Sequence, residues 1–102
     1  MSDSIAYTVS ATFSSCAVAD EWIAWLTGGH IAEVIRGGAT DAEIVHLDGD
    51  ECRYEIRYHF PSRDVFRAYE QNHAPRLRAE GLERFPASRG IVYARTTGTV
   101  VG

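Results

Sequence analysis

Residues 65–81 read VFRAYEQNHAPRLRAEG, and the skeleton of this stretch already occurs once, 43 positions earlier in the chain. In both copies, large apolar residues, a histidine and a glycine recur at every fourth position. The matched positions are Trp22, Leu26, His30, Val34 and Gly38 in the first copy and Val65, Tyr69, His73, Leu77 and Gly81 in the second. Side chains four residues apart share roughly one face of a helix, so each copy predicts an amphipathic helix with an inward-pointing histidine.

Both predicted helices are expected to break at their histidine. Pro75 has no N–H to bond back into a helix, and it disfavours the helical conformation at the residue before it. Gly28 and Gly29 lie just before His30, and each glycine costs about 1 kcal/mol relative to alanine inside a helix. His30 and His73 are therefore each predicted to lie at a joint between two helical segments.

The remaining chain supplies four strands. The alternation of apolar and polar residues predicts strands at 5–13, 52–60 and 91–97, with a weaker strand at 39–47. Helical regions are expected over 18–36 and 62–85, and Asp48-Gly49-Asp50 is a good hairpin turn. The order βαββαβ predicts a single ferredoxin-like domain over residues 1–102, with both helical regions on one face of an antiparallel four-stranded sheet.

Charge is distributed unevenly along the chain. All ten basic residues are arginine, which excludes enzymes that use a Schiff-base lysine or a P-loop lysine. Residues 1–51 contain nine acidic residues and one arginine, whereas residues 52–102 contain five acidic residues and nine arginines. The two halves are expected either to pair with each other or to pair with a second copy of the chain.

The sequence also predicts a location. It has no secretory signal pattern after Met1 and no apolar run of about 20 residues, so we expect a cytoplasmic protein. Cys16 and Cys52 lie outside any C-x-x-C pattern, which argues against a disulfide framework or a thiolate zinc site. They are expected to be small, unpaired apolar residues.

The face of the sheet that the helices leave open is expected to be polar. It would present Thr8, Ser10, Thr12, Arg53, Glu55, Arg57 and His59. A second copy of the same sheet is the simplest cover, which predicts a homodimer through this face. In that case Arg53, Glu55 and Arg57 should pair across strands or across the interface, because isolated buried charges are costly.

The segments EWIAWLTGGHIAEVIRGG (21–38) and RAYEQNHAPRLRAEGLERF (67–85) resemble the bacterial family DUF4286, of unknown function. This family lies within the dimeric α/β-barrel group that includes antibiotic-biosynthesis monooxygenase-like and EthD-like proteins. The resemblance covers most of the chain. It falls on Trp25, His30, Val34, Tyr69, His73, Ala74, Pro75, Leu77, Gly81, Leu82, Glu83 and Phe85. The chain departs from the family pattern at Ala32, where a proline is usual, and at Gly28 and Gly29, where charged residues are usual. The resemblance implies a ferredoxin-like protomer that dimerises through its sheet and has a cavity between sheet and helices, with no established activity.

His30 and His73 are the candidate catalytic residues. Two imidazoles lining one pocket could act as general acid and base near neutral pH or bind a ligand. The alternative is that each ring satisfies backbone groups freed at its helix joint. The spacing of His30 and Glu33 is compatible with a metal site, but two such residues without further ligands predict none.

Trp22, Trp25, Tyr69 and Tyr7, together with Phe66, are candidates for an aromatic wall around a flat apolar ligand. At helical and strand spacings, the same residues are also typical of an ordinary core. No Gly-rich phosphate loop, nucleophile elbow or paired catalytic carboxylates are present, and no cofactor is predicted. RNA-recognition motifs share the element order, but an acidic chain whose aromatic strand face is covered by helices argues against nucleic acid.

The sequence is compatible with two functions. The first is a small-molecule site in each protomer that supports cofactor-free oxygenation, isomerisation or ligand carriage. The second is a non-catalytic dimeric interaction or scaffold module with structural histidines. A cavity of roughly 300 Å³ or more that is reached by an imidazole would favour the first. A filled core with both rings bonded to the backbone would favour the second.

Overall fold

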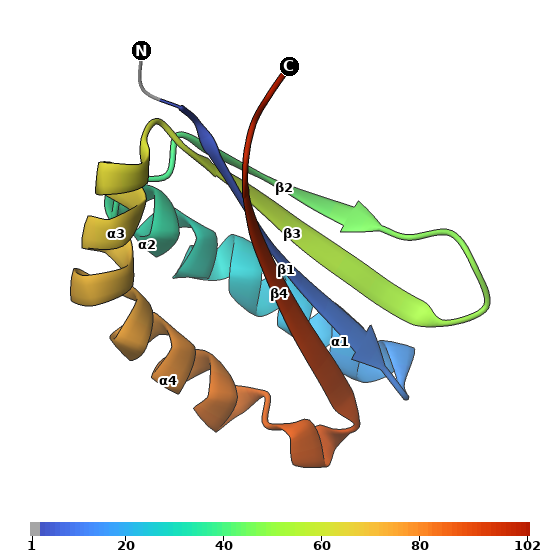
Figure 1. Cartoon of the computed structure of the whole chain (residues 1–102). Coiled ribbons are helices and arrows are strands. Elements are labelled where there is room, and N and C mark those ends of the chain that lie inside the picture. The colour runs from blue at the N-terminus through green and yellow to red at the C-terminus, as the bar shows by residue number, and fades with distance from the viewer. Residues whose placement is uncertain (1–2) are drawn as a thin grey trace.

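The computed structural model describes residues 3–102 and confirms the ferredoxin-like βαββαβ arrangement. The elements are β1 (Ile5–Phe13), α1 (Cys16–Trp25), η1 (Leu26–His30), α2 (Ile31–Arg36), β2 (Asp41–His46), β3 (Cys52–Phe60), α3 (Arg63–Asn72), α4 (Ala74–Arg84), η2 (Ala87–Arg89) and β4 (Ile91–Thr99). The four strands are antiparallel in the order β2-β3-β1-β4. All helices lie on one face of this sheet (Figure 1).

Both helical regions break where the sequence predicts. Between α1 and α2, η1 is a widened π-helical turn in which Gly29 leaves helical geometry, with φ 159° and ψ −27°. Between α3 and α4, His73 adopts φ −125° and Pro75 lies in the first turn of α4. Proline is tolerated in the first turn because its missing N–H has no partner there. Each histidine therefore lies at a joint, as expected.

The core lies between the helices and one face of the sheet. Register pairs Tyr7 of β1 with Tyr58 of β3, so their side chains share the covered face. The largest fully buried side chains are Phe60, Ile5, Ile56, Leu77 and Val34. The edge strand β4 is covered least: Ile91 is buried and Tyr93 is half-buried, but the residues that follow are exposed. The covered face is consequently open along the gap between β4 and α4.

The open face of the sheet carries part of the predicted charge pairing. Arg57 contacts Glu55 at 2.8 Å on its own strand and Glu43 at 3.5 Å on β2. Arg53 makes no ion pair with any residue in the described range 3–102, so of the two expected arrangements only pairing across the interface remains a prediction for it.

The acidic and basic halves of the sequence also pair within the chain. Glu21 of α1 accepts from Arg89 at 2.9 Å, and Glu33 of α2 lies 3.9 Å from Arg76 of α4. These contacts join the helical layer to the C-terminal half of the protomer.

The two cysteines correct the prediction of unpaired residues. Cys16 begins α1, Cys52 begins β3, and a disulfide joins them across 36 residues of sequence. They meet because Phe13, three residues before Cys16, is the strand partner of Cys52. That proximity depends on strand pairing, which spacing motifs such as C-x-x-C do not reveal. No helix within residues 3–102 combines the length and apolar character needed to cross a bilayer.

Candidate functional site

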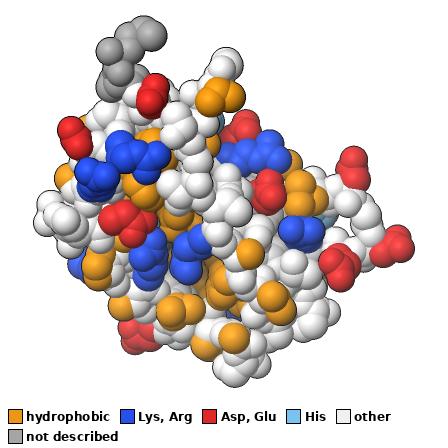
Figure 2. All heavy atoms as spheres, in the orientation of Figure 1, with side chains coloured by type: hydrophobic (Ala, Val, Ile, Leu, Met, Phe, Trp, Pro, Cys, Tyr) orange, Lys and Arg blue, Asp and Glu red, His pale blue; other side chains and the backbone are white. Residues whose placement is uncertain are grey.

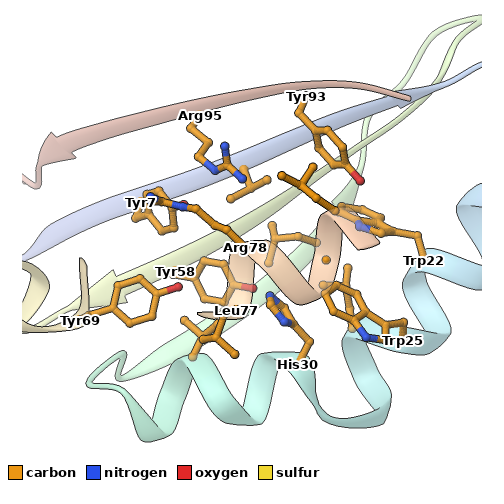
Figure 3. A pocket seen from close by; sticks show the side chains of 16 residues that line it. Tyr7, Trp22, Trp25, His30, Tyr58, Tyr69, Leu77, Arg78, Tyr93 and Arg95 are labelled. Carbon is orange, nitrogen blue, oxygen red and sulfur yellow. The ribbon is translucent and has the colours of Figure 1, made fainter. Parts of the chain in front are cut away.

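A cavity lies between the sheet and the helices and opens towards the gap between β4 and α4. It receives side chains from β1, β3, β4, α1, η1, α2, α3 and α4, and its volume is about 60 Å³. The labelled lining residues are Tyr7, Trp22, Trp25, His30, Tyr58, Tyr69, Leu77, Arg78, Tyr93 and Arg95 (Figure 3). The cavity is smaller than the roughly 300 Å³ expected for a drug-sized ligand.

His30 reaches this cavity from the end of η1. Its half-buried ring stacks on Trp25 with centroids 4.2 Å apart and planes inclined by 25°. Burial lowers the pKa of His30 from 6.5 to about 4, although the carboxylates of Glu80 and Glu33 act in the opposite direction. A buried imidazole is harder to charge, so His30 is neutral at pH 7.

His73 lies outside the cavity, so the two imidazoles do not line one pocket. Its ring lies nearly parallel to that of Tyr69, with centroids 6.4 Å apart, and it packs against the end of α2. A Cβ on Gly37 would come within 3.1 Å of its Cγ atom, which shows how close that packing is. Neither His30 nor His73 forms a ring hydrogen bond to any residue of the described chain. The proposed backbone-bonding role is therefore absent from this range as well.

The four aromatic candidates gather around the cavity. Tyr7, Trp22, Trp25 and Tyr69 all line it, and Tyr7, Trp22 and Tyr69 also belong to the buried core. Phe66 packs on Tyr7, with ring centroids 5.5 Å apart, but does not reach the cavity. The cavity and the core thus share one set of side chains, which is why spacing alone could not separate the two interpretations.

Tyr58 of β3 and Tyr93 of β4 extend the aromatic wall. Burial raises the pKa of Tyr58 and Tyr69 well above the ordinary value, so both hydroxyls stay protonated. Tyr93 of β4 donates its hydroxyl to the Phe85 carbonyl at 2.8 Å, which holds its ring over the cavity. The sequence alternation of β4 places Tyr93 on the covered face. Aromatic residues are common on such a face, so the sequence did not identify Tyr93 as a site residue.

Sequence reasoning missed two arginines that line the cavity, Arg78 of α4 and Arg95 of β4. Arg95 had a detectable signal. It alternates with Ile91 and Tyr93, and it pairs with Val9 in the register of β1, so it occupies a position on the covered face. A charged residue at such a position is uncommon unless it has a partner or a function. Arg78 had no comparable signal, because it lies beside the repeated stripe of α4 and not on it.

Two unpaired nitrogen atoms mark this cavity. Within residues 3–102, the buried side-chain nitrogen or oxygen atoms that have no hydrogen-bond partner are Nδ1 of His30 and Nε of Arg78. Buried polar atoms are nearly always paired, because leaving one unpaired costs about 1 to 3 kcal/mol. Both residues line the same cavity, so one bound molecule could contact both side chains.

A separate surface groove of about 380 Å³ lies on the other side of the Trp25–His30 pair. It is bounded by Gly28 and Gly29 and by the charged side chains of Glu33, Glu80 and Arg84, together with Trp25 and His30. The described part of the chain contains no group of three or more metal-ligating side chains, so His30 and Glu33 have no third ligand there.

Comparisons with known proteins identify a family and ferredoxin-like structures of the same fold. The family model for DUF4286, a domain of unknown function, matches residues 4–97. No curated protein matches the sequence. A dimeric ferredoxin-like protein from an uncultured marine organism is similar, with 14% identity and a TM-score of 0.74, over 98% of this chain and 97% of that one.

Two Streptomyces proteins are similar at the same level. A monooxygenase from the ActVA-Orf6 gene of Streptomyces coelicolor, solved with nanaomycin D, has 16% identity and a TM-score of 0.74, over 98% of this chain and 89% of that one. SnoaB, a cofactor-independent oxygenase from Streptomyces nogalater, has 13% identity and a TM-score of 0.66, over 98% of this chain and 95% of that one.

Proposed function

Since this chain belongs to the DUF4286 family of domains of unknown function, we propose from its own cavity that it binds a small aromatic ligand between the sheet and α4. One observation carries the proposal: His30 and Arg78, each with a buried side-chain nitrogen that has no partner within residues 3–102, both line one cavity with aromatic walls. Apolar walls with a few convergent polar groups are typical of small-molecule sites. A ligand that hydrogen-bonds to both atoms would relieve the cost of leaving them unpaired.

The size of the cavity limits the ligand. The cavity of about 60 Å³ is smaller than the roughly 150 Å³ cavity known to take benzene. The enclosed part therefore suits only part of a single ring, and the rest of the ligand would project between β4 and α4.

Among the residues that line this cavity, His30 is the candidate for accepting a proton from the ligand. Its neutral ring can accept a hydrogen bond from a phenol or enol hydroxyl of the ligand. Cofactor-free oxygenation and isomerisation of such a ligand both begin with removal of a proton, whereas simple carriage needs only the hydrogen bond. Fold similarity to SnoaB and to the ActVA-Orf6 monooxygenase supports considering oxygenation, by analogy of fold alone.

A titration of the isotope-labelled protein with phenol, followed by NMR, tests the proposal. The indole N–H signals of Trp22 and Trp25 should shift in a saturable way, because both rings line the cavity. His30→Phe keeps a ring on Trp25 but removes the nitrogens, and it should weaken binding about fivefold, the effect of one lost hydrogen bond. His46→Phe changes an exposed histidine of β2 and is the matched control. Indole signals that do not move up to millimolar phenol would refute the proposal.

We further propose that two protomers associate through the open faces of their sheets. Dimeric neighbours of the same fold and the uncovered polar face with its exposed Val92 support this arrangement. Val92→Asp should convert a dimer into a monomer of 11.3 kDa in sedimentation equilibrium. A protein that is monomeric before the substitution would contradict the proposal.

The cytoplasmic location remains a prediction. Structural disulfides are rare in the reducing cytosol of most organisms, so the Cys16–Cys52 disulfide provides its test. Thiol labelling of the protein in intact cells should find free cysteines if the prediction is right.

A further inference from the structure

The mouth of the cavity is positively charged although the chain as a whole has a net charge of −4. Arg78 extends from α4 and Arg95 from β4, on the two sides of the gap through which the cavity opens, and both line it (Figure 3). In the space-filling view, arginine side chains gather over this gap among hydrophobic ones (Figure 2). Both guanidinium charges also act to lower the pKa of Tyr69, against the larger effect of burial, which raises it.

Arg78 is held in place but not fully bonded. Its Nη2 atom donates to both carboxylate oxygens of Glu70, at 2.8 and 3.0 Å, and to the hydroxyl of Tyr7 at 3.3 Å. These contacts restrict the guanidinium group to one orientation, because its atoms form a rigid plane. Its Nε–H, in contrast, is buried and has no acceptor in the described chain. A ligand acceptor that reached Nε would complete the hydrogen bonding of Arg78.

Arg95 supplies charge that the protomer does not neutralise. Within the described residues it forms no ion pair, whereas Arg78 is paired with Glu70. Two guanidinium charges and one carboxylate charge leave one positive charge at the mouth. Arg95 also lies opposite Val9 on the covered face of the sheet, so its backbone directs the side chain towards the cavity and not towards the open face.

We propose that the ligand carries one anionic group, a carboxylate or a phenolate, which binds between Arg78 and Arg95 while its ring enters the cavity. This inference rests on the proposed ligand-binding function and specifies the chemical class of the ligand. A single negative charge matches the single uncompensated positive charge. Arginine is well suited to the task, because its N–H groups can bind the two oxygens of a carboxylate together.

Benzoate and benzamide are the probes that test this inference, because they share size and shape and differ in charge. Calorimetric titration of the full chain at low salt should give at least roughly tenfold tighter binding of benzoate, the effect of a charge-assisted hydrogen bond. Arg95→Gln should remove most of that preference and leave the affinity for benzamide unchanged. Arg84 lies on α4, as Arg78 does, but it borders the surface groove and not the cavity. Arg84→Gln should therefore preserve the preference for benzoate over benzamide.

The outcomes separate the two proposals. If benzoate and benzamide bind equally well, the cavity binds ligands but the anionic class is wrong. If neither probe binds to a protein that melts normally, the ligand-binding function fails and this inference fails with it. Arg95 is exposed and makes no ion pair within the described chain, so its replacement should not unfold the protein. A thermal melt of the variant checks this directly, and Arg95→Lys should restore part of the preference by restoring the charge.

Discussion

His30 should make the folded chain sensitive to acid between pH 6.5 and pH 4. Burial lowers the pKa of its ring from 6.5 to about 4, and Nδ1 has no hydrogen-bond partner within residues 3–102. Between these pH values the unfolded chain carries a proton on this imidazole and the folded chain does not. Because the unfolded state binds more protons, the free energy of unfolding rises with pH through this range and falls on acidification.

The size of the effect follows from the two pKa values. At pH 4.5, a group with pKa 6.5 in the unfolded chain and about 4 in the folded chain lowers the free energy of unfolding by about 2.5 kcal/mol relative to neutral pH. The ring is only half-buried, so solvent screening reduces the expected loss to about 1 to 2 kcal/mol. Carboxylates and the other histidines also titrate, so the effect must be isolated by substitution.

Urea unfolding of the wild type and of His30→Gln at pH 7 and pH 4.5 provides the assay. Glutamine is polar and uncharged at both pH values, so the variant should lose about 1 to 2 kcal/mol less than the wild type on acidification. His46→Gln, which removes an exposed histidine from β2, controls for the loss of a histidine as such. Equal losses in the wild type and in His30→Gln would show that the ring is not desolvated in solution, and the account of the cavity would have to change.

Two further predictions concern stability. Reducing the Cys16–Cys52 disulfide, which closes a loop of 36 residues, should cost about 4 kcal/mol on the chain-entropy account, whereas a Cys16→Ser/Cys52→Ser variant should unfold identically with and without reductant. If the melting temperature of the wild type were the same with and without reductant, the Cys16–Cys52 disulfide would be contradicted. Gly38→Ala would place a Cβ 2.6 Å from Cγ1 of Val65 at φ +130°, whereas Gly49→Ala has a similar φ, +132°, and no atom within 4 Å. The first variant should therefore lose about 1 to 3 kcal/mol more than the second in thermal unfolding, and equal losses would contradict the close packing of α2 against α3.

The sequence by itself determined the element order and the helix breaks. Alternation in residues 5–13 and 52–60 specified which side chains face the helices, because side-chain direction in a strand has a period of two. Pro75 and the pair Gly28-Gly29 placed the joints, because proline and glycine act on the backbone wherever they occur. These are local effects, and a local pattern suffices to predict them.

Only the tertiary structure decided what the site contains. Cys16 meets Cys52, and Arg78 meets Arg95 at the cavity mouth, because elements distant in sequence are brought together by strand register and helix packing. The repeat suggested two equivalent histidines, but His30 enters the cavity whereas His73 packs against Gly37. The difference arises because the first joint borders the cavity between the sheet and α4, whereas the second packs against the end of α2. A repeated pattern specifies which face of a helix a residue occupies, and only its neighbours in space specify what that face meets.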